Sequence, residues 1–338
     1  MRNHLSFDIK EISTYRSELM GWSILWIMML HFTFTQIAPL GFVAQYGFAG
    51  VDIFMMVSGL GLFYSLDKDD NVLRFYKKRL LRIFPTYYII GFFDNIIVEH
   101  DGFLTYLFRY TTIGYWTGQE YAGWFIPAII FLYLLAPLIK FVIDKKWFVL
   151  TTTAIVLIYL SAYFFADKEN ILDRSHFFLL YRIPAFIFGM VLAYWIKNGK
   201  SVRWYYYVLL AGMPFFIWLF PQHHQVYNFK YFSLAFLLPV FTICFILLSK
   251  YASFIKYKSS IKHDELCIMN YALKKMGQAS LEIYLIQGIF FTLVLNGKTE
   301  PFAQWHDLLT IGMIIASTTL GIAAHWLIDK LGIQRLLK

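Results

Sequence analysis

Residues 47–66, GFAGVDIFMMVSGLGLFYSL, decide the fold, because Asp52 is the one charged side chain among them. As an α-helix this stretch would be about 30 Å long, which matches the hydrocarbon core of a lipid bilayer. Three of its glycines, Gly50, Gly59 and Gly61, are residues that let neighbouring helices approach closely. The stretch therefore predicts a helix that crosses a membrane and packs tightly against others.

Apolar blocks of this kind recur along the whole chain and indicate an all-α integral membrane protein. Hydrophobic residues make up 59% of the 338 positions and charged residues only 15%, where a soluble domain has about a quarter. The blocks predict a bundle of about ten transmembrane helices, near residues 20–39, 46–66, 83–99, 122–143, 147–166, 178–196, 204–220, 231–249, 278–297 and 307–327.

The basic residues predict how the bundle is oriented. The N-terminal tail, alternate loops and the C-terminal tail hold 24 of the 30 Lys and Arg residues, and the other loops hold five. Basic residues concentrate on the cytoplasmic side of membrane proteins. Both termini are therefore predicted to be cytoplasmic, in a multi-pass protein of the bacterial cytoplasmic (plasma) membrane. The net charge of +9 is explained by these loops, so no nucleic-acid partner is expected.

No linker, repeat or soluble appended region interrupts the blocks, which predicts one transmembrane domain over residues 1–338. The first apolar block lacks a small-residue cleavage site and is interpreted as a retained helix. Cys244 and Cys267 cannot form a disulfide framework, and they are expected to be free thiols. No spacing of metal ligands is seen, and oligomeric state is not predicted.

Charged groups are costly in hydrocarbon, so those inside predicted spans are candidates for a functional site. They are His31, Asp52, Asp94, Arg182, Glu282 and His325. His31 lies near the middle of its span, where an imidazole suits general acid–base catalysis but could also simply bridge helices. Asp52 and Arg182 could equally form a structural ion pair, and His325 lies close to a membrane surface.

A basic stretch, FYKKRLLRIFPTYY (75–88), is the second feature. Lys78, Arg79 and Arg82 are three or four residues apart and share a helix face. Such a group can bind anionic lipid headgroups, or it can hold the phosphates of a nucleotide-bearing substrate. The sequence leaves both possibilities open.

Aromatic residues gather in the predicted outer segment at 100–121, among them Tyr110, Tyr115, Trp116 and Tyr121. Aromatic side chains there could stack on sugar rings. They are also typical of the belt that any membrane protein places at the lipid–water interface.

Six motifs in order resemble the acyltransferase-3 family of membrane acyltransferases. RSELMGWSILWIMMLHF (16–32) and GFAGVDIFMMVSGLGLFYSL are similar to its first two helices, and FYKKRLLRIFPTYY to its basic motif. WFIPAIIFLYLLAP (124–137), YRIPAFIFGM (181–190) and LEIYLIQG (281–288) complete the series. The residues that carry the match include Ser58, Trp124, Tyr133, Arg182 and Tyr284.

The resemblance implies transfer of an acyl group, often acetyl from acetyl-CoA, to hydroxyl groups of surface or lipid-linked glycans. His31 would be the catalytic residue, and Lys78, Arg79 and Arg82 would hold the acyl-CoA, a donor substrate and not a permanently bound cofactor. Supporting roles would fall to Asp52, Ser58, Trp124, Tyr133, Arg182, Glu282 and Tyr284. The expected partners are the lipid bilayer, acyl-CoA and a glycan or lipid-linked sugar acceptor.

Three departures place the chain in a divergent branch of that family. Met20 stands where many members have an arginine, Ile129 and Ile130 where many have paired glutamates, and Gln287 where a histidine is common. Two other functions therefore stay open. One is a transporter of glycan or lipid-linked sugar with a central histidine as proton relay, and the other is a non-catalytic subunit of a polysaccharide synthesis complex.

Overall fold

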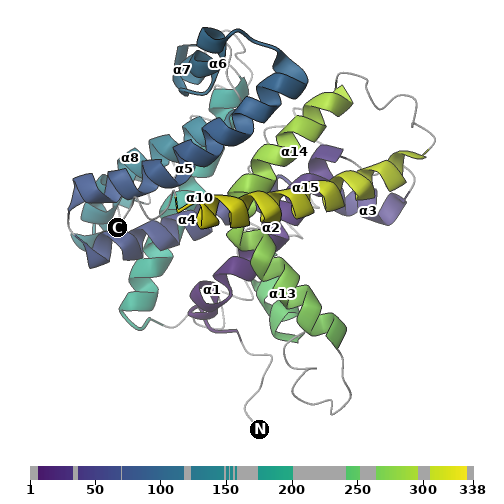
Figure 1. Ribbon diagram of the computed structural model, residues 1–338. Helices are drawn as coiled ribbons and strands as arrows, with labels where there is room; N and C mark the ends of the chain where they lie inside the picture. Colours follow the sequence, from purple (N-terminus) through teal and green to yellow (C-terminus); the bar gives the residue numbers. More distant parts are fainter. Residues whose placement is uncertain are drawn as a thin grey trace. The chain divides into compact units, whose positions relative to one another are not determined.

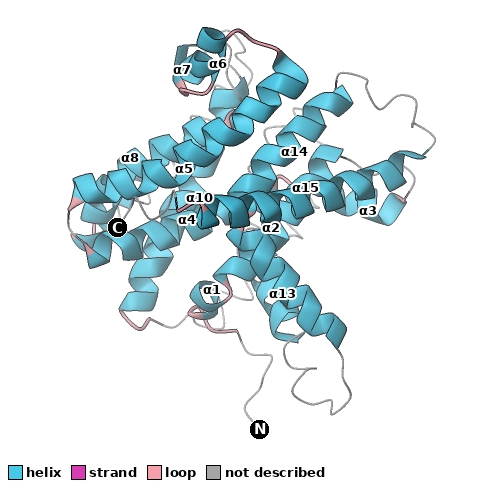
Figure 2. Ribbon diagram, in the orientation of Figure 1, coloured by secondary structure: helices cyan, strands magenta, loops and turns pink. Residues whose placement is uncertain are grey.

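The computed structural model describes residues 7–32, 37–69, 71–117, 123–147, 150–151, 153–154, 157, 174–200, 241–251, 264–295 and 305–332. Within these ranges the regular structure is entirely helical, as Figure 2 shows. The predicted all-α class is confirmed for this part of the chain.

The helices follow the chain order shown in Figure 1. They are α1 (Glu11–Thr14), α2 (Arg16–Phe32), α3 (Ala38–Ala44), α4 (Ala49–Lys68), α5 (Val72–Asp94), the π-helix η1 (Asn95–Glu99), α6 (Phe103–Arg109), α7 (Ile113–Thr117), α8 (Phe125–Asp144), α10 (Arg174–Lys197), α13 (Asp264–Gln278), α14 (Ser280–Leu295) and α15 (His306–Lys330). A further apolar helix covers Phe241–Tyr251.

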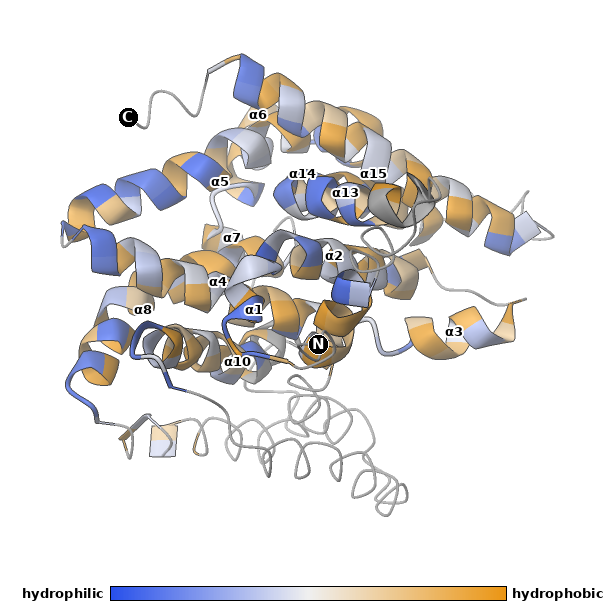
Figure 3. Ribbon diagram, turned by 90° about the horizontal axis from the view of Figure 1, so that it is seen from below, coloured by the Kyte–Doolittle hydropathy of each residue, from blue (hydrophilic) through white to orange (hydrophobic). Residues whose placement is uncertain are grey.

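Among the described residues, four continuous helical stretches are long and apolar enough to cross a membrane: Ala49–Lys68, Val72–Glu99, Phe125–Asp144 and His306–Lys330. The pair Ile268–Gln278 and Ser280–Val294 would be a fifth crossing, bent by 81° at its break. Hydrophobic residues cover most of the α15 ribbon in Figure 3, whereas α5 carries hydrophilic bands. Predicted span 204–220 and most of spans 147–166 and 231–249 lie outside the described residues, so the count of ten and the side of the termini stay predictions.

Two predicted boundaries are wrong. The span predicted at 20–39 is not one helix, because α2 ends at Phe32 and α3 begins at Ala38. Pro39 lies in the first turn of α3, where proline is favoured because its missing N–H would have no helical partner. The loop predicted at 67–82 is mostly helix, since α5 begins at Val72 and continues past Pro85. Its lysines, arginines and leucines are good helix formers.

The chain divides into two compact units. Unit 1 comprises Met1–Leu19, Asp52–Val72 and Phe131–Tyr271, and unit 2 comprises Met20–Val51, Leu73–Ile130 and Ala272–Lys338. The single domain expected over residues 1–338 stays a prediction.

In unit 1, glycines bring α4 and α10 into backbone contact. A side chain at Gly59 would meet the carbonyl oxygen of Phe186, and one at Gly189 would meet that of Met56. Each helix therefore presents a glycine to the other's backbone, as the glycines of the 47–66 stretch predict.

In unit 2, the part of α2 that carries His31 is fixed by contacts along its length. A side chain at Gly21 would meet the backbone of Leu273, and the indole Nε1 of Trp26 donates a hydrogen bond to the carbonyl oxygen of Val43 (2.8 Å). At the C-terminal end of α2, the Thr310 hydroxyl of α15 donates to the carbonyl oxygen of Phe32 (3.1 Å). This bond ties the last described turn of α2 to α15.

Candidate active site

His31 is the next-to-last residue of α2, so the contacts that hold the end of this helix also position the imidazole. Its ring is half-buried and stacks on the Phe291 ring of α14, with centroids 4.9 Å apart and an angle of 30° between the planes. An imidazole in such a stack keeps its ring plane fixed while its nitrogens stay available at the ring edge.

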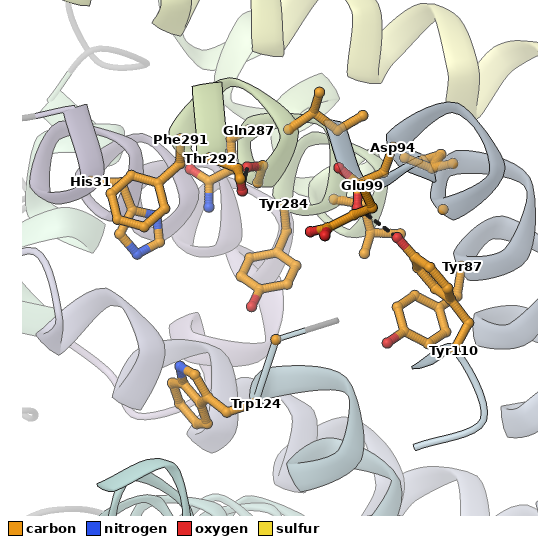
Figure 4. A pocket seen from close by; sticks show the side chains of 16 residues that line it. His31, Tyr87, Asp94, Glu99, Tyr110, Trp124, Tyr284, Gln287, Phe291 and Thr292 are labelled. Atoms are coloured by element: carbon orange, nitrogen blue, oxygen red, sulfur yellow. Dashed lines mark hydrogen bonds between the residues drawn. The ribbon is translucent and has the colours of Figure 1, made fainter. Parts of the chain in front are cut away.

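A cavity of about 300 Å³ opens beside His31, entirely within unit 2. Figure 4 shows its polar and aromatic side chains. Its walls come from α2, α5, η1, α14 and the segments around residues 110 and 124. The lining residues are His31, Tyr87, Ile90, Gly91, Asp94, Glu99, Tyr110, Gly123, Trp124, Tyr284, Leu285, Gln287, Gly288, Ile289, Phe291 and Thr292.

One face of α14 forms the wall next to His31. Tyr284, Gln287, Gly288 and Phe291 are three, four and seven residues apart, which places them on the same side of the helix. A side chain at Gly288 would meet no atom within 4 Å, so this position opens directly onto free space. Because of this spacing, the four side chains form one continuous wall that runs from the Phe291 ring, which stacks on His31, to the phenol of Tyr284.

Gln287 is the buried polar group of this wall, with 1% of its surface exposed. Neither its amide nitrogen nor its amide oxygen has a hydrogen-bond partner among the described residues, and the same holds for Nδ1 of His31. Figure 4 places the amide beside the His31 ring. Buried polar groups are nearly always hydrogen-bonded, so this amide and imidazole are suited to receive polar atoms of a substrate.

The opposite end of the cavity is acidic and aromatic. Tyr87, Gly91 and Asp94 share a face of α5, and Glu99 follows from η1, a helix type that is frequent at functional sites. The Tyr110 hydroxyl donates a hydrogen bond of 2.6 Å to Asp94. Burial raises the pKa of Tyr110, which keeps this phenol protonated as the donor.

Hydrogen bonds and ion pairs fix the chain around this acidic end. Arg109 Nε donates to Asp101 (2.8 Å), and another guanidinium nitrogen lies 3.4 Å from Glu99. The side chain of Asn95 exchanges two hydrogen bonds of 3.0 Å with the backbone of Asp101. These contacts close the segment that follows α5 into a defined loop.

Trp124 and Tyr284, both expected in the site, do line the cavity with His31. Gly123 has a φ of +75°, a conformation that glycine adopts readily, and it brings its neighbour Trp124 to the wall. The Tyr284 ring packs against Phe125 with centroids 4.8 Å apart.

The basic residues expected to hold the donor lie on α5 of the same unit but do not line this cavity. Lys78 and Arg82 are exposed, and the half-buried Arg79 guanidinium lies over the Phe75 ring, 5.6 Å from its centroid. The first cavity residue on this helix is Tyr87, five residues after Arg82 and about 7.5 Å further along the axis.

Four other candidates belong to unit 1. Asp52 and Arg182 form a buried ion pair of 2.5 Å. This is the structural ion pair that the sequence offers as one of two interpretations of these residues, the other being a role in the functional site. Ser58 on α4 and Tyr133 on α8 are half-buried, and neither lines the cavity.

Glu282, in unit 2, is buried and lies 3.1 Å from Nδ1 of His325 on α15. Its described partner is thus His325 and not His31. The ionisable residue at 325 therefore has a partner within the protein.

The sequence reasoning missed several lining residues. Gln287 was noted only as a departure from a family pattern, and Asp94 only as a charge in a span. Tyr87, Glu99 and Phe291 were not singled out. The spacing of Tyr284, Gln287 and Phe291 is the one signal that could have connected part of this wall.

Comparison with known proteins decides the family. A family model described as an acyltransferase domain, acyltransferase 3, matches residues 19–329. The chain belongs to the acyltransferase-3 family. A relative, "Putative acetyltransferase ORF330" of Acidianus two-tailed virus, is 27% identical over 201 residues, which are 56% of this chain and 59% of the relative. The chain thus spans about three-fifths of that relative's length. No solved structure matches this chain. Family and apolar helices together identify a membrane protein of an acyltransferase family.

Proposed function

We propose that this protein is a membrane O-acyltransferase that moves an acyl group, acetyl from acetyl-CoA, onto a hydroxyl of a cell-surface or lipid-linked glycan. The observation that carries the proposal is the position of His31, which lines a 300 Å³ cavity in the unit that also holds the basic start of α5. A base, a space for reactants and a cationic surface thus occur in one unit.

His31 acts as the general base in this mechanism. It takes the proton of the acceptor hydroxyl as the oxygen attacks the thioester carbonyl, and the sulfur of coenzyme A leaves. The imidazolium then returns the proton to that sulfur, so His31 is regenerated. Such proton transfer contributes about 10²–10⁴-fold to a rate. A transient acyl-histidine, formed by attack of His31 itself, is the other route to the same products.

Lys78, Arg79 and Arg82 hold the phosphates of the donor. Arginine forks match phosphate geometry, and the exposure of Lys78 and Arg82 leaves this surface open. The α5 axis runs from these residues to the cavity wall at Tyr87, so the thioester arm of the donor would follow it. Basic residues favour the cytoplasmic side, which is where acyl-CoA is made.

The setting is the bilayer of a cell membrane, for which we propose the bacterial cytoplasmic membrane. The donor is a substrate that leaves as free coenzyme A, so catalysis needs no permanently bound cofactor. Any Lewis-acid or redox step is unnecessary for acyl transfer from a thioester to a hydroxyl.

Transport of a glycan is a second candidate function, supported by one observation. The pair α13–α14 breaks near Ala279 with a bend of 81°, and broken helices form substrate sites in transporters. Acyl-CoA binding separates the two functions, because a glycan transporter has no need of it. Dependence of transfer on His31 separates the enzyme from a non-catalytic subunit.

The first test is binding of acetyl-CoA and desulfo-CoA to the purified protein in detergent. We expect specific binding that Arg79→Ala/Arg82→Ala weakens and that His31→Ala leaves intact. Lys145→Ala/Lys146→Ala is the matched control, since it removes two exposed cations of unit 1. Equal loss in the control would mean a general charge effect, and no binding to the wild type would reject the acyltransferase.

The second test is release of coenzyme A during transfer to a glycan acceptor. His31→Ala is expected to lower the rate by about 10²–10⁴-fold without lowering donor affinity. A variant that keeps its transfer rate would rule out His31 as base and nucleophile.

A further inference from the structure

We propose that the cavity end formed by Asp94, Glu99 and Tyr110 is the acceptor subsite, and that it accepts neutral or cationic sugar units and excludes anionic ones. This inference rests on the proposed acyl transfer and names the substrate class of the same site. It would exclude uronic acids and phosphorylated sugars as the unit that enters the cavity.

The charges around this end are the first support. Two carboxyl groups, of Asp94 and Glu99, line the cavity, and no Lys or Arg is among the described residues that line it. The nearby Arg109 is paired with both Glu99 and Asp101, so its single positive charge is shared by two carboxylates. An anionic sugar would meet like charges at short range in a poorly solvated space, which is a strong element of selection against it.

The aromatic residues are the second support. Tyr87, Tyr110, Trp124 and Tyr284 all line the same cavity, and Figure 4 shows Tyr284 between the His31 end and the acidic end. Aromatic faces bury the C–H surface of a sugar ring, while carboxylates accept hydrogen bonds from its hydroxyl groups. The sequence allows two roles for Tyr110, Tyr115, Trp116 and Tyr121, stacking on sugar rings or forming an interfacial belt. Of these four, Tyr110 lines this cavity.

The acidic end is held in place before any ligand arrives. Tyr110 donates to Asp94 (2.6 Å), the Tyr106 hydroxyl donates to the carbonyl oxygen of Tyr88 (2.7 Å), and Asn95 is bonded twice to Asp101. Side chains fixed in this way lose little freedom when a ligand binds, which favours selective binding of a flexible sugar.

Gln287 is an independent sign of a polar ligand. It is 1% exposed and lines the cavity next to His31, and neither polar atom of its amide makes a well-aligned hydrogen bond among the described residues, although the amide lies close to the imidazole. Its amide can donate to the thioester carbonyl oxygen or accept from the acceptor hydroxyl. A sugar held at the acidic end would thereby present one hydroxyl to His31 and Gln287.

Binding of three oligosaccharides of equal length tests the inference on purified protein. They are tetra-N-acetylglucosamine, its cationic deacetylated form and tetragalacturonate, measured by isothermal titration calorimetry. We expect the neutral or the cationic probe to bind at least about tenfold more tightly than the anion. The isosteric double variant Asp94→Asn/Glu99→Gln should reduce the ratio of the two dissociation constants, anionic over neutral or cationic probe, by about tenfold. This is the scale of one charge-assisted hydrogen bond.

Controls keep the outcomes separate. Asp144→Asn removes an exposed carboxylate of unit 1 and should leave the gap unchanged. Glu99→Gln alone serves if the double variant does not fold. Equal binding of the anion, an unchanged gap in the double variant, or no binding of any probe would each overturn the subsite. Acetyl-CoA binding by the same sample reports separately on the proposed function.

Discussion

Breaking the Asp52–Arg182 ion pair with Arg182→Met is expected to destabilise unit 1 severely. The two side chains are 1% and 3% exposed, and their charged atoms are 2.5 Å apart. Methionine fills a similar space but leaves the Asp52 carboxylate buried without its cation. Removing one partner of a buried ion pair costs about 3–5 kcal/mol, because the remaining charge has lost both water and counter-ion.

This cost should be visible as a shift of the unfolding midpoint. At about 2–4 °C per kcal/mol for a unit of this size, Arg182→Met should unfold roughly 6–20 °C below the wild type. The measurement is thermal unfolding in detergent, followed by tryptophan fluorescence. Asp67→Asn is the matched control. It removes the carboxylate partner of Lys197, whose side chain is 49% exposed, and one of the two carboxylates beside Lys140, which keeps Asp144; it should change the midpoint little.

A double variant separates a structural role from a catalytic one. Asp52→Leu/Arg182→Met leaves no unpaired buried charge, so it should regain much of the stability lost in Arg182→Met. If Arg182→Met unfolds within a degree or two of the wild type yet loses transfer activity, the pair serves catalysis and the structural argument is refuted.

Two glycine substitutions probe the cavity itself. Gly288→Leu should abolish acceptor binding while the protein stays folded, because the new side chain enters the open space of the cavity. Gly312→Leu, on the exposed face of α15, is the control. Equal acceptor binding by both variants would contradict the cavity assignment. Gly91→Ala should weaken acceptor binding by disturbing the Tyr110–Asp94 bond, since a Cβ at this position would overlap the Tyr110 ring; an unchanged affinity measured by calorimetry would refute this.

Sequence predicts best the helices whose apolar run is unbroken. The stretch predicted at 46–66 is α4 at Ala49–Lys68, and that predicted at 307–327 is α15 at His306–Lys330. Composition and length suffice in these cases, because a bilayer imposes both. They fail at 20–39, where hydropathy continues through a change of helix, and at 67–82, where a charged segment is as helical as an apolar one.

The candidate site divides in the same way. His31, Trp124 and Tyr284 could be named from sequence, and all three line one cavity. The acidic end could not be assembled, since Asp94 meets Tyr110 across a turn whose course depends on η1 and its contacts. No periodicity relates a π-helix to the loop that follows it, so these residues become a group only in three dimensions.

Gln287 connects the family pattern to the chemistry of this chain. An amide has no proton that it can give up near neutral pH, so it can orient a substrate but cannot relay a proton. The family pattern that the chain resembles has a histidine at this position, which would place two titratable rings side by side. With glutamine there, the proposed mechanism gives proton transfer at this end of the cavity to His31 alone, and the amide would hold the carbonyl or hydroxyl that reacts. The departure at 287 is therefore compatible with catalysis by a single base, provided that His31 keeps an open nitrogen towards the cavity.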